Sequence, residues 1–326
     1  RQRQMCIRDS RYGCGDAAVM IKINDRIIEL VQDGIQWAGA KDTVARTLDF
    51  SIVYQPLDKT LPNYQAAVGD KVAYIQNNKT FFYGYIENLK YNTDDNLLNI
   101  HCCDLMKRLL NSKCIGRFKG TLNQLADNIC GIFSLKNGIE SDSTHIHNII
   151  STGDLSYYDV LKTACDVMFE RYCPYLDGTT LKIAEHTIQD TFEIRKNIRA
   201  SSFEQNMKEI VNKVLIIDNK GNLINTVEDK ESINKYGLFQ EVFKYDKDSK
   251  NNLADAQKII QSVQNEAVIT VENNNECIAG RYIRVYEPVN NFKGIFEITS
   301  DSHNICANSN MTLEIEFVGV DNESNG

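Results

Sequence analysis

The 326-residue chain lacks the features that would place it at once in a functional class. No apolar stretch approaches the roughly 20 residues that a membrane helix needs, and no secretory leader pattern is present, so we expect no membrane insertion. No G-x-S-x-G, H-E-x-x-H, P-loop or G-x-G-x-x-G sequence occurs. The sequence therefore contains no motif that would indicate one of several large enzyme classes. The sequence therefore names no catalytic, cofactor-binding or metal-binding residue, and we expect no cofactor.

The ten cysteines also lack a recognisable framework. They are scattered, Cys102 and Cys103 are adjacent, and no C-x-x-C or Cys/His pair stands at zinc spacing. We expect reduced core thiols of a protein made in a reducing cytoplasm. The net charge of −8 and the absence of a large basic cluster argue against specific nucleic-acid binding.

Histidine offers one candidate metal pair and two isolated residues. His145 and His147 flank one residue, so both rings would lie on the same side of an extended segment. No third ligand is evident nearby, and the pattern favours a surface loop. His186 and His303 are isolated in the sequence, which favours structural or exposed positions over catalytic ones.

The chain is rich in short alternating patterns that predict antiparallel strands. Leu48, Phe50, Ile52 and Tyr54 alternate with other residues in the period of a half-buried strand. Similar strands are expected at 68–74, 82–86 and 98–102, and a first strand pair around a turn at 24–25. Trp37, the only tryptophan, is expected in the core of this first β domain.

The same pattern returns near the C-terminus and suggests an internal duplication. Gly69 and Gly84 lie 15 residues apart, and Gly280 and Gly294 lie 14 apart, each pair with strand-like sequence around it. An alternating strand follows each time, at 98–102 and at 311–317. Chance similarity between two antiparallel sheets is the alternative interpretation.

These patterns predict an α+β, mainly β fold of two similar small antiparallel β-barrel domains with an inserted α/β module. The first barrel spans 19–115, the module 116–200 and the second barrel 201–320 with a helix at 253–265. Capping boxes at 121–124 and 156–159 open two helices of the module, and a hairpin follows at 172–184. Residues 5–10 resemble a translated sequencing adapter, and 1–18 are excluded as a non-native leader. Residues 321–326 form a polar tail.

Seven segments in the same order resemble the XkdQ/YqbQ family of phage tail proteins. They span roughly 20–320 and are Trp37-Ala38-Gly39 with Arg46-Thr47-Leu48-Asp49-Phe50, Val68-Gly69-Asp70, Phe82-x-Gly84-x-Ile86, Leu155-Ser156-Tyr157-Tyr158-Asp159, Met207-x-x-Ile210-Val211-Asn212-Lys213-Val214, Tyr236-Gly237-Leu238-Phe239-Gln240-Glu241-Val242 and Ser300-Asp301-Ser302-His303.

The resemblance implies a non-enzymatic baseplate or tail hub protein of a contractile-tailed phage or phage-tail-like particle. Such a chain would form a homotrimeric ring that adapts the sixfold tail tube to the threefold spike. Its implied partners are the tail tube protein, the spike and other baseplate proteins, and its implied location is the virion tail. Two similar barrels in each of three chains would present six similar faces.

Two alternatives concern the inserted module. It could carry a tail-associated peptidoglycan hydrolase, although no Cys/His or Glu pattern with a partner supports one. It could instead bind cell-wall glycan through Tyr157, Tyr158, Tyr172 and Tyr175, and so contact the bacterial wall. Tyrosines at these spacings more often lie in a core or at its rim.

Overall fold

The computed structural model describes residues 19–29, 31, 34–41, 43–61, 64–139, 143–168, 172–185, 192–247, 251–289, 292–305 and 309–319. The expected leader, the polar tail and His186 lie outside these residues. The chain divides into two compact units, 1–200 with 269–326, and 201–268. Each unit is described by itself.

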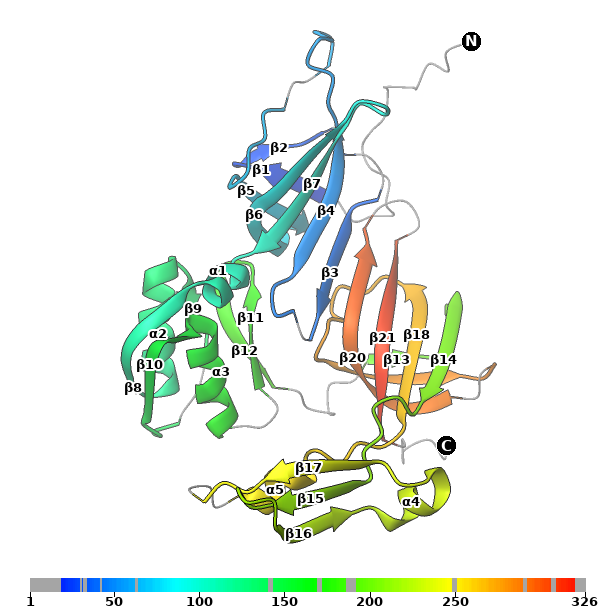
Figure 1. The fold of residues 1–326 in the computed structure, drawn as a ribbon. Coiled ribbons are helices and arrows are strands. Elements are labelled where there is room, and N and C mark those ends of the chain that lie inside the picture. Colours follow the sequence, from blue (N-terminus) through cyan, green and yellow to red (C-terminus); the bar gives the residue numbers. More distant parts are fainter. Residues whose placement is uncertain are drawn as a thin grey trace. The chain divides into compact units, whose positions relative to one another are not determined.

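The first half of the larger unit forms an antiparallel sheet (Figure 1). Leu48, Phe50 and Ile52 point into a core that also holds Trp37 and Tyr74, so the predicted alternation is confirmed. Asn24 and Asp25 take positive φ in the predicted turn. The strands are β1 (Val19–Ile23), β2 (Arg26–Ile27), β3 (Gln36–Ala40), β4 (Thr47–Val53), β5 (Lys71–Gln76), β6 (Lys79–Asn92) and β7 (Leu97–Asp104).

The last part of the chain repeats this arrangement. Its strands are β13 (Phe192–Ile194), β14 (Ala200–Asn206), β18 (Gln264–Glu272), β19 (Tyr282–Glu287), β20 (Phe292–Asn304) and β21 (Asn310–Gly319). The sheet order β3-β4-β7-β6-β5 in the first half corresponds to β14-β18-β21-β20-β19 in the second. Both series follow the chain in the same sequence, which supports an internal duplication.

Matching backbone hydrogen bonds fix the register of the two repeats. Gly69 donates to the Ile86 carbonyl at 2.8 Å, and Gly280 donates to the Ile298 carbonyl at 2.7 Å. Ile86 and Ile298 each donate back, at 2.9 Å, to the residue after the glycine. One residue beyond each isoleucine the strand carries a β-bulge. Ile86 and Ile298 are therefore equivalent positions.

This register corrects one detail of the predicted repeat. Gly84 lies two residues before Ile86, whereas Gly294 lies four residues before Ile298, so the two strand glycines are not equivalent. Both are nevertheless required by close backbone approach. A Cβ atom at Gly84 would lie 2.2 Å from the Cys103 carbonyl oxygen, and one at Gly294 would lie 2.7 Å from the Gly319 carbonyl oxygen.

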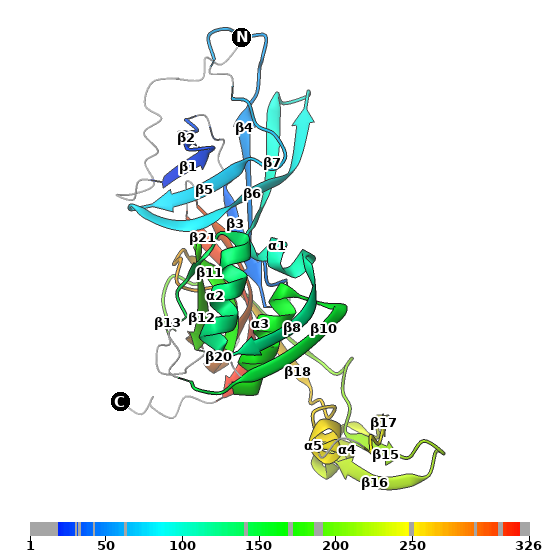
Figure 2. The same cartoon turned by 90° about the vertical axis from the view of Figure 1, so that its left-hand side faces the viewer.

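Pairing of β3 with β20 joins the two repeats into one 13-stranded sheet. Both views show these strands side by side (Figures 1 and 2). The predicted mainly β class is confirmed, while closure of each repeat into a barrel remains a prediction. The sheet is continuous because an edge strand of one repeat satisfies its backbone groups on the other repeat.

The inserted module follows β7 and has a core of its own. The capping box of Thr121 and Gln124 is present at the start of α2, and Ser156 and Asp159 exchange hydrogen bonds at the start of α3. The predicted hairpin turns at Gly178, which has φ +61°. The elements are α1 (Met106–Asn111), β8 (Lys113–Gly120), α2 (Leu122–Phe133), β9 (Lys136–Asn137), β10 (His147–Ser156), α3 (Tyr157–Met168), β11 (Tyr172–Asp177) and β12 (Thr180–Glu185).

Most of the smaller unit lies between β14 and β18, where the chain forms a three-stranded sheet and two short helices. These elements are β15 (Lys213–Ile217), β16 (Leu223–Glu228), α4 (Lys230–Tyr236), β17 (Gln240–Lys244) and α5 (Asn252–Gln257). The helix expected at 253–265 is wrong in its second half, because the chain enters β18 at Gln264. The 3–4-residue spacing of apolar side chains ran on past the true end of the helix.

The predicted second domain, 201–320, thus contains the whole smaller unit, which begins within β14 and ends within β18, together with β19, β20 and β21 of the second repeat. The predicted domain boundaries remain predictions. Among the described residues, no helix is long and apolar enough to cross a bilayer.

Candidate functional site

The joint between the two repeats is centred on a buried ion pair. Arg46 Nη1 donates to Asp301 Oδ1 at 3.0 Å, and Arg46 Nη2 bonds to Asp301 Oδ2, so the pairing is bidentate. The Asp301 side chain is fully buried and that of Arg46 is 15% exposed. Arg46 precedes β4 and Asp301 lies on β20, so the pair connects the repeats.

Aromatic packing fixes the position of the guanidinium group. The Arg46 Cζ atom lies 4.1 Å from the centre of the Trp37 ring, in cation–π geometry. Gly39 leaves the space for this side chain, because a Cβ atom there would lie 2.4 Å from Arg46 Nη1. The tryptophan and the glycine, two residues apart on β3, therefore serve the same arginine.

Asp301 has further partners that stabilise its charge. The Ala279 amide donates to Asp301 Oδ1 at 2.6 Å, and His303 Nε2 lies 3.1 Å from Asp301 Oδ2. His303 Nδ1 in turn lies 2.6 Å from Asn273 Oδ1. His303 is fully buried and packs on Trp37 with ring centres 4.9 Å apart. The predicted structural position of His303 agrees with these contacts.

Electrostatics favours the ionised form of Asp301. Burial alone would raise the pKa of this carboxyl group. The charge of Arg46, the nearby His303 ring and the hydrogen bonds from Arg46 act in the opposite direction, and the net pKa is lowered from its ordinary value of 3.8. The ion pair is therefore intact at neutral pH.

Two of the seven family-like segments meet at this joint. In the register of β3 and β20, Trp37 lies opposite His303 and Gly39 lies opposite Asp301. The sequence placed these residues in two family-like segments. It did not show that the two segments, more than 250 positions apart, are in contact. Their function is to hold the two repeats together.

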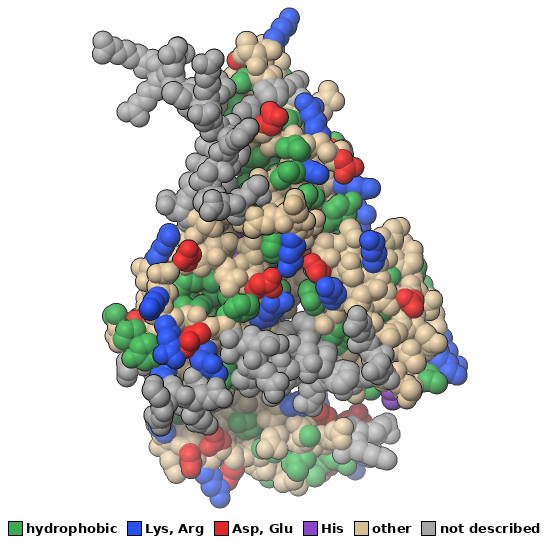
Figure 3. Space-filling view, turned by 180° about the vertical axis from the view of Figure 1, so that it is seen from behind, with side chains coloured by type: hydrophobic (Ala, Val, Ile, Leu, Met, Phe, Trp, Pro, Cys, Tyr) green, Lys and Arg blue, Asp and Glu red, His purple; other side chains and the backbone are tan. Residues whose placement is uncertain are grey.

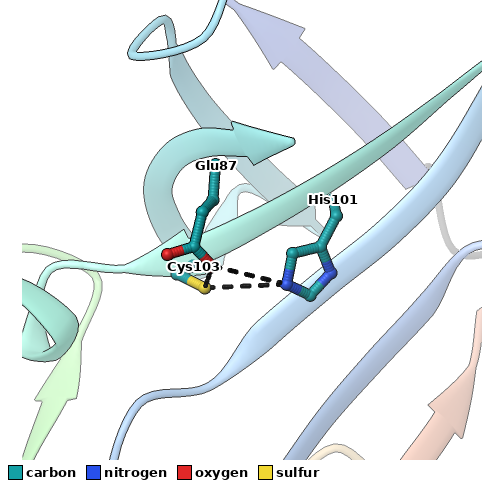
Figure 4. Close-up of side chains that lie close together, drawn as sticks. All are labelled: Glu87, His101 and Cys103. Atoms are coloured by element: carbon teal, nitrogen blue, oxygen red, sulfur yellow. Dashed lines mark hydrogen bonds and ion pairs between the residues drawn. The ribbon is translucent and has the colours of Figure 1, made fainter. Parts of the chain in front are cut away.

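A second cluster, on the outer face of the first repeat, brings together Glu87, His101 and Cys103 (Figure 4). The Cys103 thiol donates to Glu87 Oε2 at 3.0 Å. His101 Nε2 lies 3.7 Å from Cys103 Sγ and 3.7 Å from Glu87 Oε2. The other ring nitrogen, Nδ1, lies 2.6 Å from Asp49 Oδ1.

The cluster shifts the protonation of its thiol and carboxylate in opposite directions. Burial, the hydrogen bond to Glu87 and the charge of Glu87 raise the pKa of Cys103 to about 12. The same hydrogen bond lowers the pKa of Glu87. Sequence reasoning missed this site. The available signal was the His101-x-Cys103 spacing, which places both side chains on one face of a strand.

The structure places several of the residues that the sequence singled out in the module. His145 and His147 do lie together, with ring centres 4.7 Å apart. However, His147 is buried at the start of β10 and does not lie in a surface loop. Tyr158 is buried, and Tyr157 packs against Phe118 and Phe133, so these two tyrosines do not form an exposed stacking surface.

The fold defines a class of protein in which two sheet repeats are joined edge to edge around an inserted module. A 43 kDa tail protein of prophage MuSo2 from Shewanella oneidensis has this fold, with TM-score 0.71 and 14% identity over 93% of this chain and 99% of that one. A tail protein from Neisseria meningitidis MC58 is similarly close, with TM-score 0.70 and 12% identity over 93% and 97%.

A third similar structure is an Escherichia coli component of the type VI secretion system that resembles the phage T4 tail proteins gp27 and gp5. It has TM-score 0.50 and 11% identity, covering 92% of this chain and 77% of its own. Among curated proteins, none matches the sequence. Residues 35–316 match the YqbQ-like family, and the chain belongs to that family. The predicted resemblance is confirmed.

Proposed function

We propose that this protein is a structural hub of a phage tail or baseplate, in which three chains form a ring between the sixfold tail tube and the threefold spike. The observation that carries the proposal is the internal duplication with a defined joint. Each chain supplies two repeats of the same strand order, and β3 of the first repeat pairs with β20 of the second.

Two other strands, β6 and β14, are equivalent to β20 and β3, and in the described part of the chain they have no partner strand at the corresponding edges. On β20, residues 300–304 pair with β21 on one side and β3 on the other. The equivalent stretch of β6, residues 88–92, pairs with β7, and no strand of the described part of the chain pairs with its other side. At the opposite end of the sheet, β14, the equivalent of β3, pairs with β18, and no second partner strand is found for it among the described residues.

Repeating the internal joint between copies would satisfy both edges. β14 of one chain would pair with the 88–92 stretch of β6 in the next, as β3 pairs with β20 inside the chain. A head-to-tail contact of this kind generates a ring when its rotation closes. If every joint has the same geometry, three chains give six similar joints, which matches a sixfold tube.

Surface chemistry is compatible with assembly by strand pairing. Neither edge contains a proline, and both are largely exposed in the single chain. On the face in Figure 3, basic and acidic side chains of the described residues are interspersed. A surface of mixed charge steers partners less strongly than an extended surface of one sign. Shape and backbone pairing therefore contribute more to the choice of partner.

Light scattering of the full chain tests the trimer, with negative-stain class averages of the same sample. We expect the mass of three chains and a ring with six similar lobes. A monomer at every concentration up to the solubility limit would contradict the proposal.

The edge pairing has a separate test in Ser202 on β14. Arg199 N donates toward β18, to Thr270 O at 2.8 Å, so alternation along the strand directs the Ser202 amide away from β18. Ser202→Pro removes this outward donor and should weaken the trimer, whereas Ser202→Ala keeps the amide and should not. Equal trimer formation by both variants would refute the β14 joint and leave the trimer standing.

A further inference from the structure

We propose that Glu87, His101 and Cys103 bind one zinc ion, with a fourth coordination position open to water. The inference is independent of the hub proposal, because it concerns three side chains of one repeat. These three side chains take no part in the contacts described above between the two repeats. A set of one thiolate, one imidazole and one carboxylate favours zinc over magnesium or calcium, which prefer oxygen ligands.

The distances between the three ligand atoms already approach those of a tetrahedral zinc site. Zinc–ligand bonds of about 2.1–2.3 Å imply separations of about 3.4 Å between N and O and about 3.6 Å from sulfur to N or O. The structure has 3.7 Å between His101 Nε2 and Glu87 Oε2, 3.7 Å between His101 Nε2 and Cys103 Sγ, and 3.0 Å between Cys103 Sγ and Glu87 Oε2. The largest adjustment is therefore about 0.6 Å.

The strand geometry holds the three side chains on one face. Ile86 and Cys102 lie opposite each other and point into the core, where both are fully buried. The bulge makes Glu87 the extra residue of β6 between Ile86, which lies opposite Cys102, and Asn88, which lies opposite His101. His101 and Cys103 flank Cys102 on β7 and so lie on the face opposite to it. A bulge commonly re-aims a side chain in this way.

Asp49 supplies the outer support that metal-bound histidines usually have. Its Oδ1 atom lies 2.6 Å from His101 Nδ1, across the register of β4 and β7. A carboxylate at Nδ1 fixes the tautomer in which Nε2 is free to bind a metal. Lys107 Nζ lies 3.4 Å from Glu87 Oε1 and 3.5 Å from Glu87 Oε2, so zinc would take over part of the role of this ammonium group at Oε2.

The second repeat shows that the fold does not require this cluster. Its strand pair carries the same bulge after Ile298, with Thr299 as the extra residue. The positions equivalent to His101 and Cys103 are Glu314 and Glu316. The same backbone is thus built there without an imidazole or a thiol, so the three ligands of the first repeat are not explained by the needs of the sheet.

Zinc binding would replace the thiol proton. Cys103 now donates its proton to Glu87, and a bound zinc ion would take the position between the two groups as the thiol releases that proton to solvent. The zinc would link β6 to β7 at the base of the 88–92 stretch, so metal binding should raise the thermal unfolding temperature.

The test uses the full, untagged chain with Cys6→Ser and Cys14→Ser as background, titrated with zinc against a chromophoric chelator. We expect one zinc per chain. Cys103→Ser and His101→Gln should each weaken binding by at least 10-fold, and Asp49→Asn by about 10-fold or more. His145→Gln is the matched control and should bind as the background protein does.

Cobalt gives an independent reading of the ligand set. The cobalt-loaded protein should show a sulfur-to-cobalt charge-transfer band that Cys103→Ser abolishes and His145→Gln retains. His101 is 38% exposed, so His101→Gln remains decisive if the cysteine variant fails to fold. No bound zinc, or equal affinity in the His101→Gln protein and the background protein, would overturn the proposal.

Discussion

Removing Arg46 should destabilise the joint between the repeats far more than removing an exposed ion pair. The change Arg46→Ala leaves the Asp301 carboxylate buried with only the Ala279 amide and His303 as partners. Breaking a buried pair by deleting one partner costs about 3–5 kcal/mol. The lost stacking on Trp37 at 4.1 Å adds about 0.5–2 kcal/mol, while the two remaining Asp301 partners offset part of the loss. We expect a loss of about 3–5 kcal/mol in the free energy of unfolding.

Trp37 provides the assay. It is the only tryptophan and contacts Arg46 directly, so its fluorescence during urea unfolding reports on the joint itself. The matched control is Lys79→Ala, which breaks the pair with Glu276. Those two side chains are 52% and 41% exposed, and exposed pairs contribute about 0–1 kcal/mol. Equal destabilisation by Arg46→Ala and Lys79→Ala would refute the reasoning.

The same pair predicts an acid-dependent loss of stability. The pKa of Asp301 is lower in the folded chain than its ordinary value of 3.8. Its stabilising contribution is therefore fully present above that value and is lost as the pH falls through the folded-state pKa. Urea unfolding at a series of acidic pH values should show the wild type approaching Asp301→Asn below about pH 4. A gap between the two proteins that stays constant down to pH 2 would contradict this account.

Four further substitutions test other parts of the fold by thermal or urea unfolding. Gly84→Ala should destabilise the first repeat strongly, because its Cβ would meet the Cys103 carbonyl oxygen at 2.2 Å, whereas Gly131→Ala, in open space on α2, should stabilise by about 0.5–1 kcal/mol. Thr121→Ala removes the capping bond of α2 and should cost about 1 kcal/mol. Asn212→Ala should destabilise the smaller unit by about 2 kcal/mol, because this fully buried side chain bonds to the Gly237 carbonyl and the Phe239 amide. Unchanged stability in any of these variants except Gly131→Ala would contradict the contact it tests.

Local sequence rules predicted most helices and strands, because the formation of each helix or strand depends largely on residues that are close in the sequence. The alternation of Leu48, Phe50 and Ile52 records which face of a strand is buried, and capping boxes record where a helix begins. The same reasoning failed at 258–265, where an apolar spacing compatible with a helix belongs to the connection that follows α5 and to the first residues of β18. Period alone does not separate these outcomes in a short segment.

The sites required information that local rules do not contain. The bulge that presents Glu87 beside His101 and Cys103 depends on how β6 pairs with β7. In the sequence, Glu87 lies 14 residues from His101 with nothing to connect them. A one-residue change of register would turn Glu87 to the other face, so only the pairing makes the cluster.

The sequence by itself determined that this is a mainly β chain with a repeated strand pattern, an inserted helical module and the ordered segments of its family. These properties follow from side-chain periodicity, turns and caps, which act over a few residues. Only the tertiary structure decided that β3 pairs with β20, that Arg46 neutralises Asp301, and that Glu87 lies beside His101 and Cys103. Edge pairing is made by backbone groups common to almost all residues, so its partner is selected by three-dimensional packing.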